Sequence, residues 1–209
     1  MIRERQSIRG MKPAEALREA VLGLRLRAVN RVIVVALDGP SGAGKSTLAN
    51  AIAGDLSAAV VHVDDFYRDM PDADRRELSP LEGVDRYFDW QRLREEALMP
   101  LVQREPARFQ RFNWSAGQGL IGSVAVEASD VVIVEGVYSA RPELEDLVDL
   151  KVLVKVADRD RVQRREARLR TVSRHDPRGW DARWDAAERV YFETIRPPSN
   201  FDLIVAGDA

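Results

Sequence analysis

The chain has 209 residues, of which 45% are hydrophobic and 32% are charged, and its 32 Lys and Arg and 34 Asp and Glu leave a net charge of −2. A charge balance this close to neutral argues against electrostatic attraction of the whole molecule to nucleic acid or to a membrane surface. Because the chain has no cysteine and only 2 histidines, disulfides, thiolate zinc sites, cysteine nucleophiles and histidine-rich metal sites are excluded.

The length of the chain favours one domain over residues 1–209 rather than two. The first residues lack the apolar core of a signal peptide, and no run of 18 apolar residues occurs in the sequence. We therefore expect a cytoplasmic protein with no membrane or nucleic-acid partner. A homo-oligomer is compatible with this composition, which does not decide the number of subunits.

Residues 1–29 predict an N-terminal extension followed by a helix. The first 11 residues are polar and basic, and Pro13 is acceptable as the first residue of a helix. After it, apolar residues recur at spacings of three and four, which predicts one apolar helix face that packs on a sheet. These residues are Ala16, Leu17, Ala20, Val21 and Leu24.

The stretch Gly39–Thr47 reads GPSGAGKST and lies between the β-branched run Val32–Leu37 and the apolar run Leu48–Ala53. A glycine-rich turn between a strand and a helix presents backbone N–H groups and a positive helix end to one point, which suits a phosphate. The signature G-x-x-x-x-G-K-[S/T] predicts a nucleotide-binding loop, although an ordinary glycine-rich turn is the alternative. Lys45 would reach the β- and γ-phosphates of ATP, and Ser46 would hold Mg²⁺. The residues assigned to nucleotide binding are Gly39, Ser41, Gly42, Ala43, Gly44, Lys45, Ser46 and Thr47.

A second apolar run, Ala58–Val63, ends in the acidic pair Asp64 and Asp65. In open α/β sheets the carboxyl ends of the strands face the ligand crevice, so we expect this pair beside the phosphate loop, where a catalytic base is needed. The alternative is that both aspartates solubilise a loop or cap a helix.

Residues 68–122 predict an insertion on the substrate side. Residues 68–85 are polar and acidic with turn signals, which predicts a long connecting loop near the substrate. The pattern of Tyr87–Leu98 predicts a helix that ends before Pro100. The alternation in Phe109–Trp114 predicts a strand or hairpin arm. Its aromatics Phe112 and Trp114 would stack on a planar ring of the substrate, or else they pack against the sheet.

A third buried strand, Val131–Val134, ends in Glu135, and a carboxylate at this position is typical of groups that hold magnesium or its waters. A plain strand-end cap is the alternative role for Glu135. The runs Leu150–Val156 and Phe201–Val205 supply two further strands. Strands that alternate with helices predict an α/β fold of the three-layer P-loop NTPase type, with a mostly parallel five-stranded sheet and helices on both faces.

Residues 158–183 are the most unbalanced stretch in charge, because Arg159–Arg183 contains nine arginines against four acidic residues. Arg161, Arg165 and Arg168 are spaced by four and three, so a helix would project them from one face. Guanidinium groups bind phosphate oxygens bidentately, which predicts an arginine-rich lid over a phosphate site. A solvated basic face is the alternative. The pattern of Trp180–Ile195 then predicts a core helix.

Several motifs together resemble the uridine kinases, in the phosphoribulokinase and uridine kinase group of P-loop small-molecule kinases. The resemblance covers roughly residues 30–205 and rests on GPSGAGKST, VDDFYR (Val63–Arg68), VIVEGVYS (Val132–Ser139), the arginine helix Asp158–Arg168 and RPPSNFDLIV (Arg196–Val205). It implies that Asp64, which would also lie near the metal, is the base that takes the proton from a sugar hydroxyl. It further implies that Asp65 and Tyr67 are on the substrate side, and that the three lid arginines contact phosphate, with Arg168 catalytic.

We therefore expect an ATP-dependent kinase that transfers the γ-phosphoryl group to a hydroxyl of a small metabolite, with magnesium bridging the phosphates. A uridine-like nucleoside is the leading acceptor. The segments Gly83–Tyr87 and Ser115–Gly117 depart from the uridine kinase pattern, so pantothenate, nicotinamide riboside or a sugar remain alternatives. An ATP-binding regulatory module without an acceptor is the alternative from another class, and the paired aspartates favour the enzyme.

Overall fold

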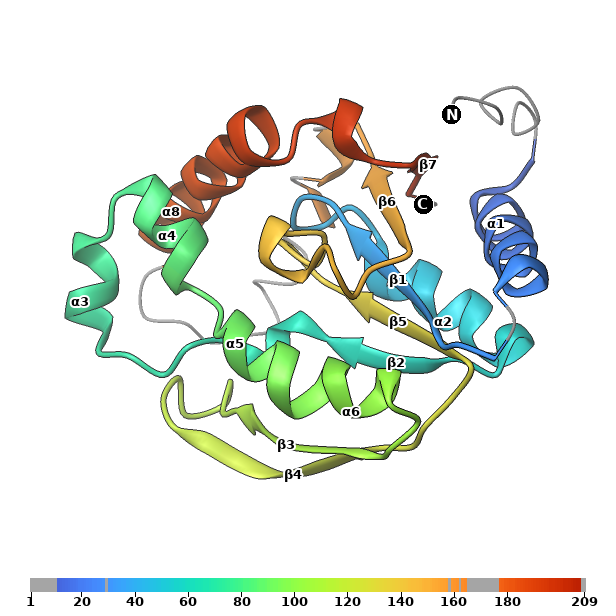
Figure 1. The fold of residues 1–209 in the computed structure, drawn as a ribbon. Helices are drawn as coiled ribbons and strands as arrows, with labels where there is room; N and C mark the ends of the chain where they lie inside the picture. Colours follow the sequence, from blue (N-terminus) through green and yellow to red (C-terminus); the bar gives the residue numbers. More distant parts are fainter. Residues whose placement is uncertain (1–10, 29, 158, 162, 165–176, 208–209) are drawn as a thin grey trace.

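A five-stranded sheet forms the centre of the computed structural model, which describes residues 11–28, 30–157, 159–161, 163–164 and 177–207. The strand order is β2-β5-β1-β6-β7, and every neighbouring pair is parallel (Figure 1). The predicted five-stranded α/β sheet is thus confirmed. The strands are β1 (Ile33–Asp38), β2 (Ala59–His62), β5 (Val131–Glu135), β6 (Leu150–Lys155) and β7 (Leu203–Ala206).

Helices cover both faces of this sheet. On one face, α1 (Pro13–Arg27) and α2 (Lys45–Leu56) pack on alternate residues of β1, including Ile33 and Val35. The intervening residues Val34 and Ala36 face a second core. Since successive side chains of a strand point to opposite faces, a strand covered on both faces is apolar along its length, as β1 is from Ile33 to Leu37.

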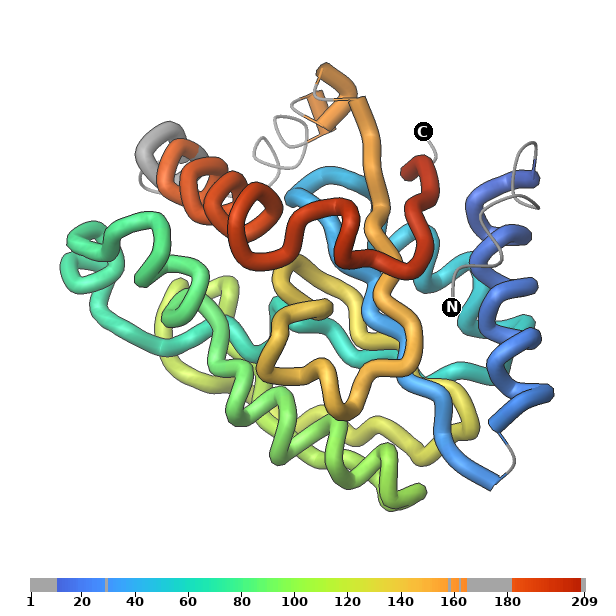
Figure 2. The backbone as a smooth tube through the Cα atoms, turned by 45° about the horizontal axis from the view of Figure 1, so that its top comes forward, coloured from blue at the N-terminus to red at the C-terminus, as the bar shows by residue number. Residues whose placement is uncertain are grey.

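Residues 68–85 are largely helical, so the expectation of a long loop there was wrong. They form α3 (Asp72–Glu77) and α4 (Pro80–Arg86). The second helix begins with a capping box, in which Ser79 and Glu82 satisfy each other's backbone N–H groups. It packs against α8 (Pro177–Val190), on the side of the molecule opposite α1 (Figure 2).

The helix predicted to end before Pro100 instead continues past it, so this boundary was also wrong. It runs through α5 (Trp90–Arg92), the π-helical segment η2 (Leu93–Leu98) and α6 (Met99–Val102). Proline lacks an N–H group and crowds the preceding turn of a helix. The wider π-helical turn directly ahead of Pro100 relieves both conflicts, which lets the helix continue.

The predicted strand or hairpin arm is confirmed as β3 (Ala107–Phe112), which forms an antiparallel pair with β4 (Leu120–Val126). It packs beside η1 (Val63–Phe66), where the rings of Phe66 and Phe109 are 4.6 Å apart between centroids. The predicted helix over Trp180–Ile195 appears as α8 and the π-helical η4 (Tyr191–Ile195). Two short helical turns complete the fold, η3 (Pro142–Leu144) and η5 (Pro198–Asn200).

The proposed lid is described only in part. Residues 159–161 and 163–164 are helical, whereas Arg165 and Arg168 lie outside the described residues. Within the ranges that the structure covers, each helix is too short or too polar to cross a membrane.

Candidate active site

The phosphate loop follows β1 directly and leads into α2 at Lys45. Gly39, Gly42 and Gly44 have φ angles of 148°, 83° and 94°, which side chains rarely adopt. At Gly39 a Cβ atom would lie 2.4 Å from the carbonyl oxygen of Val154 on β6, so only glycine fits there. Gly44, the N-cap of α2, offers no side chain to its free N–H groups, which leaves them available to an anion.

The Lys45 side chain folds back over this loop. Its Nζ atom donates hydrogen bonds to the carbonyl oxygens of Gly39, at 2.8 Å, and Pro40, at 3.1 Å. Lys45 is 8% exposed, so its charge is held close to the loop rather than in solvent. The ammonium is therefore held at the end of the loop that follows β1.

The predicted metal residues Ser46 and Glu135 are in contact. Ser46 Oγ donates to Glu135 Oε1 at 3.0 Å, and His62 Nδ1 lies 2.6 Å from the same oxygen. The parallel register explains this meeting, because His62 and Glu135 are paired at the ends of neighbouring strands. Burial pushes the pKa of Glu135 upward, but His62 and the charge of Lys45 outweigh it and lower the pKa. The hydrogen bond to Glu135 raises the pKa of His62.

These oxygen atoms fit a magnesium ion. In the described part of the chain, no three His, Asp or Glu side chains gather into a metal-binding group. Mg²⁺ in nucleotide sites is typically held by one or two protein oxygens, while phosphates and waters complete its shell. The Ser46 hydroxyl and the Glu135 carboxylate suit that arrangement.

The acidic pair lies on η1, one helical turn that directly follows β2. Asp64 is exposed and Asp65 is half-buried. Burial raises the pKa of Asp65, and the charges of Asp64 and Glu135 act in the same direction, against His62. Trp114 on the hairpin donates from Nε1 to the Asp64 carbonyl oxygen at 3.1 Å. The structure thus places the pair at the same sheet edge as the phosphate loop.

The residues predicted for the substrate side gather around Tyr67. This side chain is 1% exposed, and its ring centroid lies 5.0 Å from that of Phe112 and 4.8 Å from that of Trp114. Trp184 of α8 stacks on it at 6.0 Å, and the Arg75 guanidinium lies 4.7 Å from its centroid. Tyr67 and Phe112 are therefore packed within the protein, while Trp114 stays half-buried.

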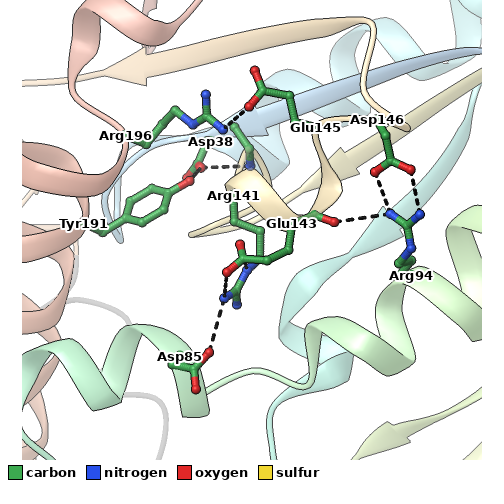
Figure 3. Close-up of polar contacts among 10 residues, drawn as sticks. Asp38, Asp85, Arg94, Arg141, Glu143, Glu145, Asp146, Tyr191 and Arg196 are labelled. Carbon is green, nitrogen blue, oxygen red and sulfur yellow. Dashed lines mark hydrogen bonds and ion pairs between the residues drawn. The ribbon is translucent and has the colours of Figure 1, made fainter.

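Asp38, at the end of β1, was missed by the sequence argument and is a fully buried carboxylate next to the loop (Figure 3). It accepts hydrogen bonds from the N–H groups of Gly39, Tyr138 and Ala140 and from the Tyr191 hydroxyl, at 2.7 to 3.0 Å. Burial raises its pKa, while these bonds oppose the shift. The strand-end argument that singled out Glu135 applies equally to Asp38.

Two ion pairs lie beside the hydrogen bonds of Asp38. Arg141 Nε donates to Glu143 at 2.8 Å, and Arg196 pairs with Glu145 at 3.0 Å (Figure 3). Arg141 and Arg196 are each 4% exposed. The Arg196–Glu145 pair links the segment after η4 to the segment after β5, and the hydrogen bonds of Asp38 tie the segment after β5 and η4 itself to the end of β1.

Glu188 on α8 was also missed. Its Oε1 atom accepts hydrogen bonds from the N–H group of Ser41, at 3.1 Å, and from the Ser41 hydroxyl. Arg161, predicted to contact phosphate, lies with its Nη1 atom 3.4 Å from Glu188 Oε2 and 3.2 Å from Asp185 Oδ1. The helix pattern of α8 identified its core face but carried no signal for this contact.

A parallel α/β sheet with a glycine-rich phosphate loop, a lysine over that loop and carboxylates at the neighbouring strand ends defines a P-loop kinase fold. The family model of the cytidylate kinases matches residues 35–144, more than half of the chain. The chain therefore belongs to the cytidylate kinase family.

Curated relatives are uridine kinases. The uridine kinase of Latilactobacillus sakei is 29% identical over 170 residues, covering 79% of this chain and 76% of that protein. The uridine kinase of Alkaliphilus metalliredigens is 29% identical over 183 residues, covering 81% and 80%. Uridine-cytidine kinase C of Dictyostelium discoideum is 27% identical over 136 residues, which span 65% of this chain but only 29% of that longer protein.

Two solved structures share the fold. A proposed fructose transport system kinase from Silicibacter sp. TM1040 matches with a TM-score of 0.71 and 28% identity, covering 93% of this chain and 99% of that one. A proposed uridine kinase from Bacillus stearothermophilus matches with a TM-score of 0.67 and 20% identity, covering 92% and 97%. The chain is a uridine kinase-like P-loop protein, an ATP-dependent small-molecule kinase.

Proposed function

We propose that this kinase transfers the γ-phosphoryl group of ATP, in the presence of Mg²⁺, to a hydroxyl of a uridine-like nucleoside in the cytoplasm. The observation that carries the proposal is the contact of Glu135 with both Ser46 and His62, because His62 directly precedes the turn η1 that carries Asp64 and Asp65. The residues that would hold ATP and Mg²⁺ thus lie at the same edge of the sheet as the two aspartates. The relatives named uridine kinase support the choice of nucleoside.

On the donor side, phosphoryl transfer needs positioning and neutralisation of charge. The amides of Gly39–Thr47 would hold the phosphates, and Lys45 would neutralise charge on the phosphoryl group during its transfer. Ser46 and Glu135 would hold Mg²⁺, which, when bound, supplies further charge neutralisation. Arg161 would approach the phosphates together with Arg165 and Arg168, the two lid arginines outside the described residues.

On the acceptor side, Asp64 would take the proton from the attacking hydroxyl. Its exposed position beside the half-buried Asp65 suits a group that meets a substrate. The Tyr67 cluster, with Phe112 and Trp114, would form the wall against which the acceptor rests. Because Trp114 is the half-buried member and is bonded to the Asp64 backbone, its ring is the best placed to meet a planar base.

A sugar acceptor is the second candidate. Tyr67 and Phe112 are 1% and 2% exposed, so their rings pack on one another and offer little surface to a base. A smaller acceptor without an aromatic ring needs less of that surface. The likeness to the proposed fructose transport system kinase points in the same direction.

A substrate panel tests both candidates. The purified chain is incubated with Mg²⁺, γ-labelled ATP and, separately, uridine, cytidine or fructose, and the labelled product is separated from ATP. We expect label on uridine, and Lys45→Ala serves as the control for contaminating kinases. Label on fructose alone would favour the sugar. Hydrolysis of ATP with no labelled acceptor would contradict the kinase proposal.

A further inference from the structure

The phosphate loop of this structure already holds an anion, supplied by the protein itself. Glu188 reaches from α8 to Ser41 and is 3% exposed. One carboxylate oxygen accepts from both the N–H group and the hydroxyl of Ser41, and the other faces the Arg161 guanidinium at 3.4 Å. The carboxylate therefore links the loop to the start of the arginine-rich segment.

The groups around this carboxylate are those that bind a phosphate oxygen. A loop amide, a hydroxyl and a guanidinium are typical donors to phosphate in nucleotide sites. Burial raises the pKa of Glu188, and the bonds from Ser41 and the charge of Lys45 oppose that shift. A buried carboxylate is costly unless such donors surround it, so its position is set by groups that suit an anion.

The occupied position lies toward the terminal phosphate. The amides at the start of α2 are the ones that cradle the inner phosphates, and the loop lysine reaches the β- and γ-phosphates. Lys45 Nζ is bonded to the carbonyl oxygens of Gly39 and Pro40, next to Ser41 and ahead of α2. Glu188 thus sits at the end of the loop where the lysine charge lies and where the transferred group would be.

We propose that Glu188 is an internal substitute for the terminal phosphate of the donor: it occupies the anion position at Ser41 and is displaced when a nucleoside triphosphate binds. This inference rests on the proposed ATP site. Displacement releases Arg161 from one of its carboxylate partners, so the guanidinium becomes available to the incoming phosphate. Tyr191, which follows Glu188 by three residues, remains tied to Asp38, so the change is confined to the part of α8 before it (Figure 3).

Binding of two nucleotides tests the inference. Calorimetry measures the dissociation constants of the non-hydrolysable ATP analogue AMPPNP and of ADP for the wild-type chain and for Glu188→Gln. The neutral amide still accepts from Ser41 but does not repel a terminal phosphate, so AMPPNP should bind about tenfold more tightly to the variant. ADP has no γ-phosphate to compete with Glu188, and its affinity should change less than about twofold.

Asp185→Asn is the matched control. The substitution removes one negative charge from the same helix, and that charge also pairs with Arg161. It leaves the two hydrogen bonds from Ser41 to Glu188 in place. An equal gain in AMPPNP affinity from Asp185→Asn would overturn the inference, because the effect would then be general electrostatics. Equal or weaker AMPPNP binding by Glu188→Gln would also overturn it. Glu188→Ala, expected to change affinity in the same direction, replaces the Gln variant if thermal unfolding shows that the latter is not folded.

The outcomes separate this inference from the proposed function. Nucleotide binding by none of the proteins would overturn both the ATP site and the role of Glu188. Equal binding of AMPPNP by the wild type and Glu188→Gln would overturn the role of Glu188 alone. A selective gain in AMPPNP affinity supports the inference whichever acceptor the substrate panel identifies.

Discussion

The donor half and the acceptor half of the candidate site are built in different ways. The donor half is one continuous stretch, Gly39–Thr47, whose shape is set by backbone angles and by close approach to β6. The acceptor half is assembled from side chains that are distant in the sequence, such as Tyr67, Phe112 and Trp184. A local backbone motif therefore meets a non-local cluster of side chains at one sheet edge.

This difference predicts different consequences of substitution. A change in the donor half alters the handling of ATP and should reduce transfer to every acceptor. A change in the acceptor half alters the surface that an acceptor meets, so it should change which acceptor is used. Substitutions in each half test that division.

Lys45→Ala should reduce phosphoryl transfer by roughly 10³-fold or more with every acceptor. The substitution removes the ammonium that is hydrogen-bonded to Gly39 and Pro40 and that would neutralise charge on the phosphates. Steady-state kinetics with each accepted substrate measures the loss, and circular dichroism checks the fold. A loss confined to one acceptor would break the proposed division between the two halves.

Asp64→Asn should lower kcat by roughly 10²- to 10⁴-fold, as expected for removal of a general base. Nucleotide binding should be retained, because Asp64 lies on η1 rather than on the phosphate loop. Asp65→Asn is the matched control on the same turn, with a smaller expected effect on kcat. The reverse order of effects would transfer the role of base to Asp65, and unchanged turnover in both variants would remove it from the pair.

Tyr191→Phe should lower the free energy of unfolding by about 1.5–3 kcal/mol, since the buried Asp38 carboxylate loses one of its donors. Urea unfolding measures the change. Tyr138→Phe is the matched control, because its buried hydroxyl has no hydrogen-bond partner among the described residues. We expect the control to change stability by less than about 0.5 kcal/mol. Equal effects in the two variants would show that Asp38 does not depend on Tyr191.

Glu188→Gln should change the pH dependence of stability. Burial holds the pKa of Glu188 above its ordinary value of 4.5, so the folded chain binds this proton more tightly than the unfolded chain does. The contribution of Glu188 to stability is therefore greatest below pH 4.5 and declines as the pH rises through the raised pKa. Glutamine has no titratable carboxyl group, so the variant lacks this dependence on pH.

The stability of Glu188→Gln relative to the wild type should therefore rise as the pH rises from 4.5 to about 7. Urea unfolding of both proteins at the two pH values measures it. A difference in stability that does not vary with pH would show that burial against the loop does not raise the pKa of Glu188. The measurement tests whether burial of the Glu188 carboxylate against the phosphate loop lowers stability when no nucleotide is bound.

Much of the fold was predictable from local patterns. All five strands of the sheet and the first strand of the hairpin were placed within a few residues, because continuous or alternating apolar runs are properties of the sequence itself. The two errors have physical reasons. The start of α4 depends on the capping box at Ser79 and on packing against α8, and the helix passes Pro100 because a π-helical turn precedes it.

Within the candidate site, the sequence by itself determined the phosphate loop and the strand-end carboxylates Asp64, Asp65 and Glu135. A glycine-rich turn needs only its neighbouring residues to take shape, and parallel strands bring their carboxyl ends to one edge. The structure placed these groups together, while their roles in binding and catalysis remain predictions.

Only the tertiary structure decided which side chains complete that edge. Asp38 bonds Tyr191 across 153 positions of sequence, and Glu188 bonds Ser41 across 147. Helix periodicity identifies the buried face of α8, but it does not say which loop that face meets. The contact between Glu188 and the phosphate loop arises because α8 packs across the sheet edge, and packing of this kind is decided by the whole fold.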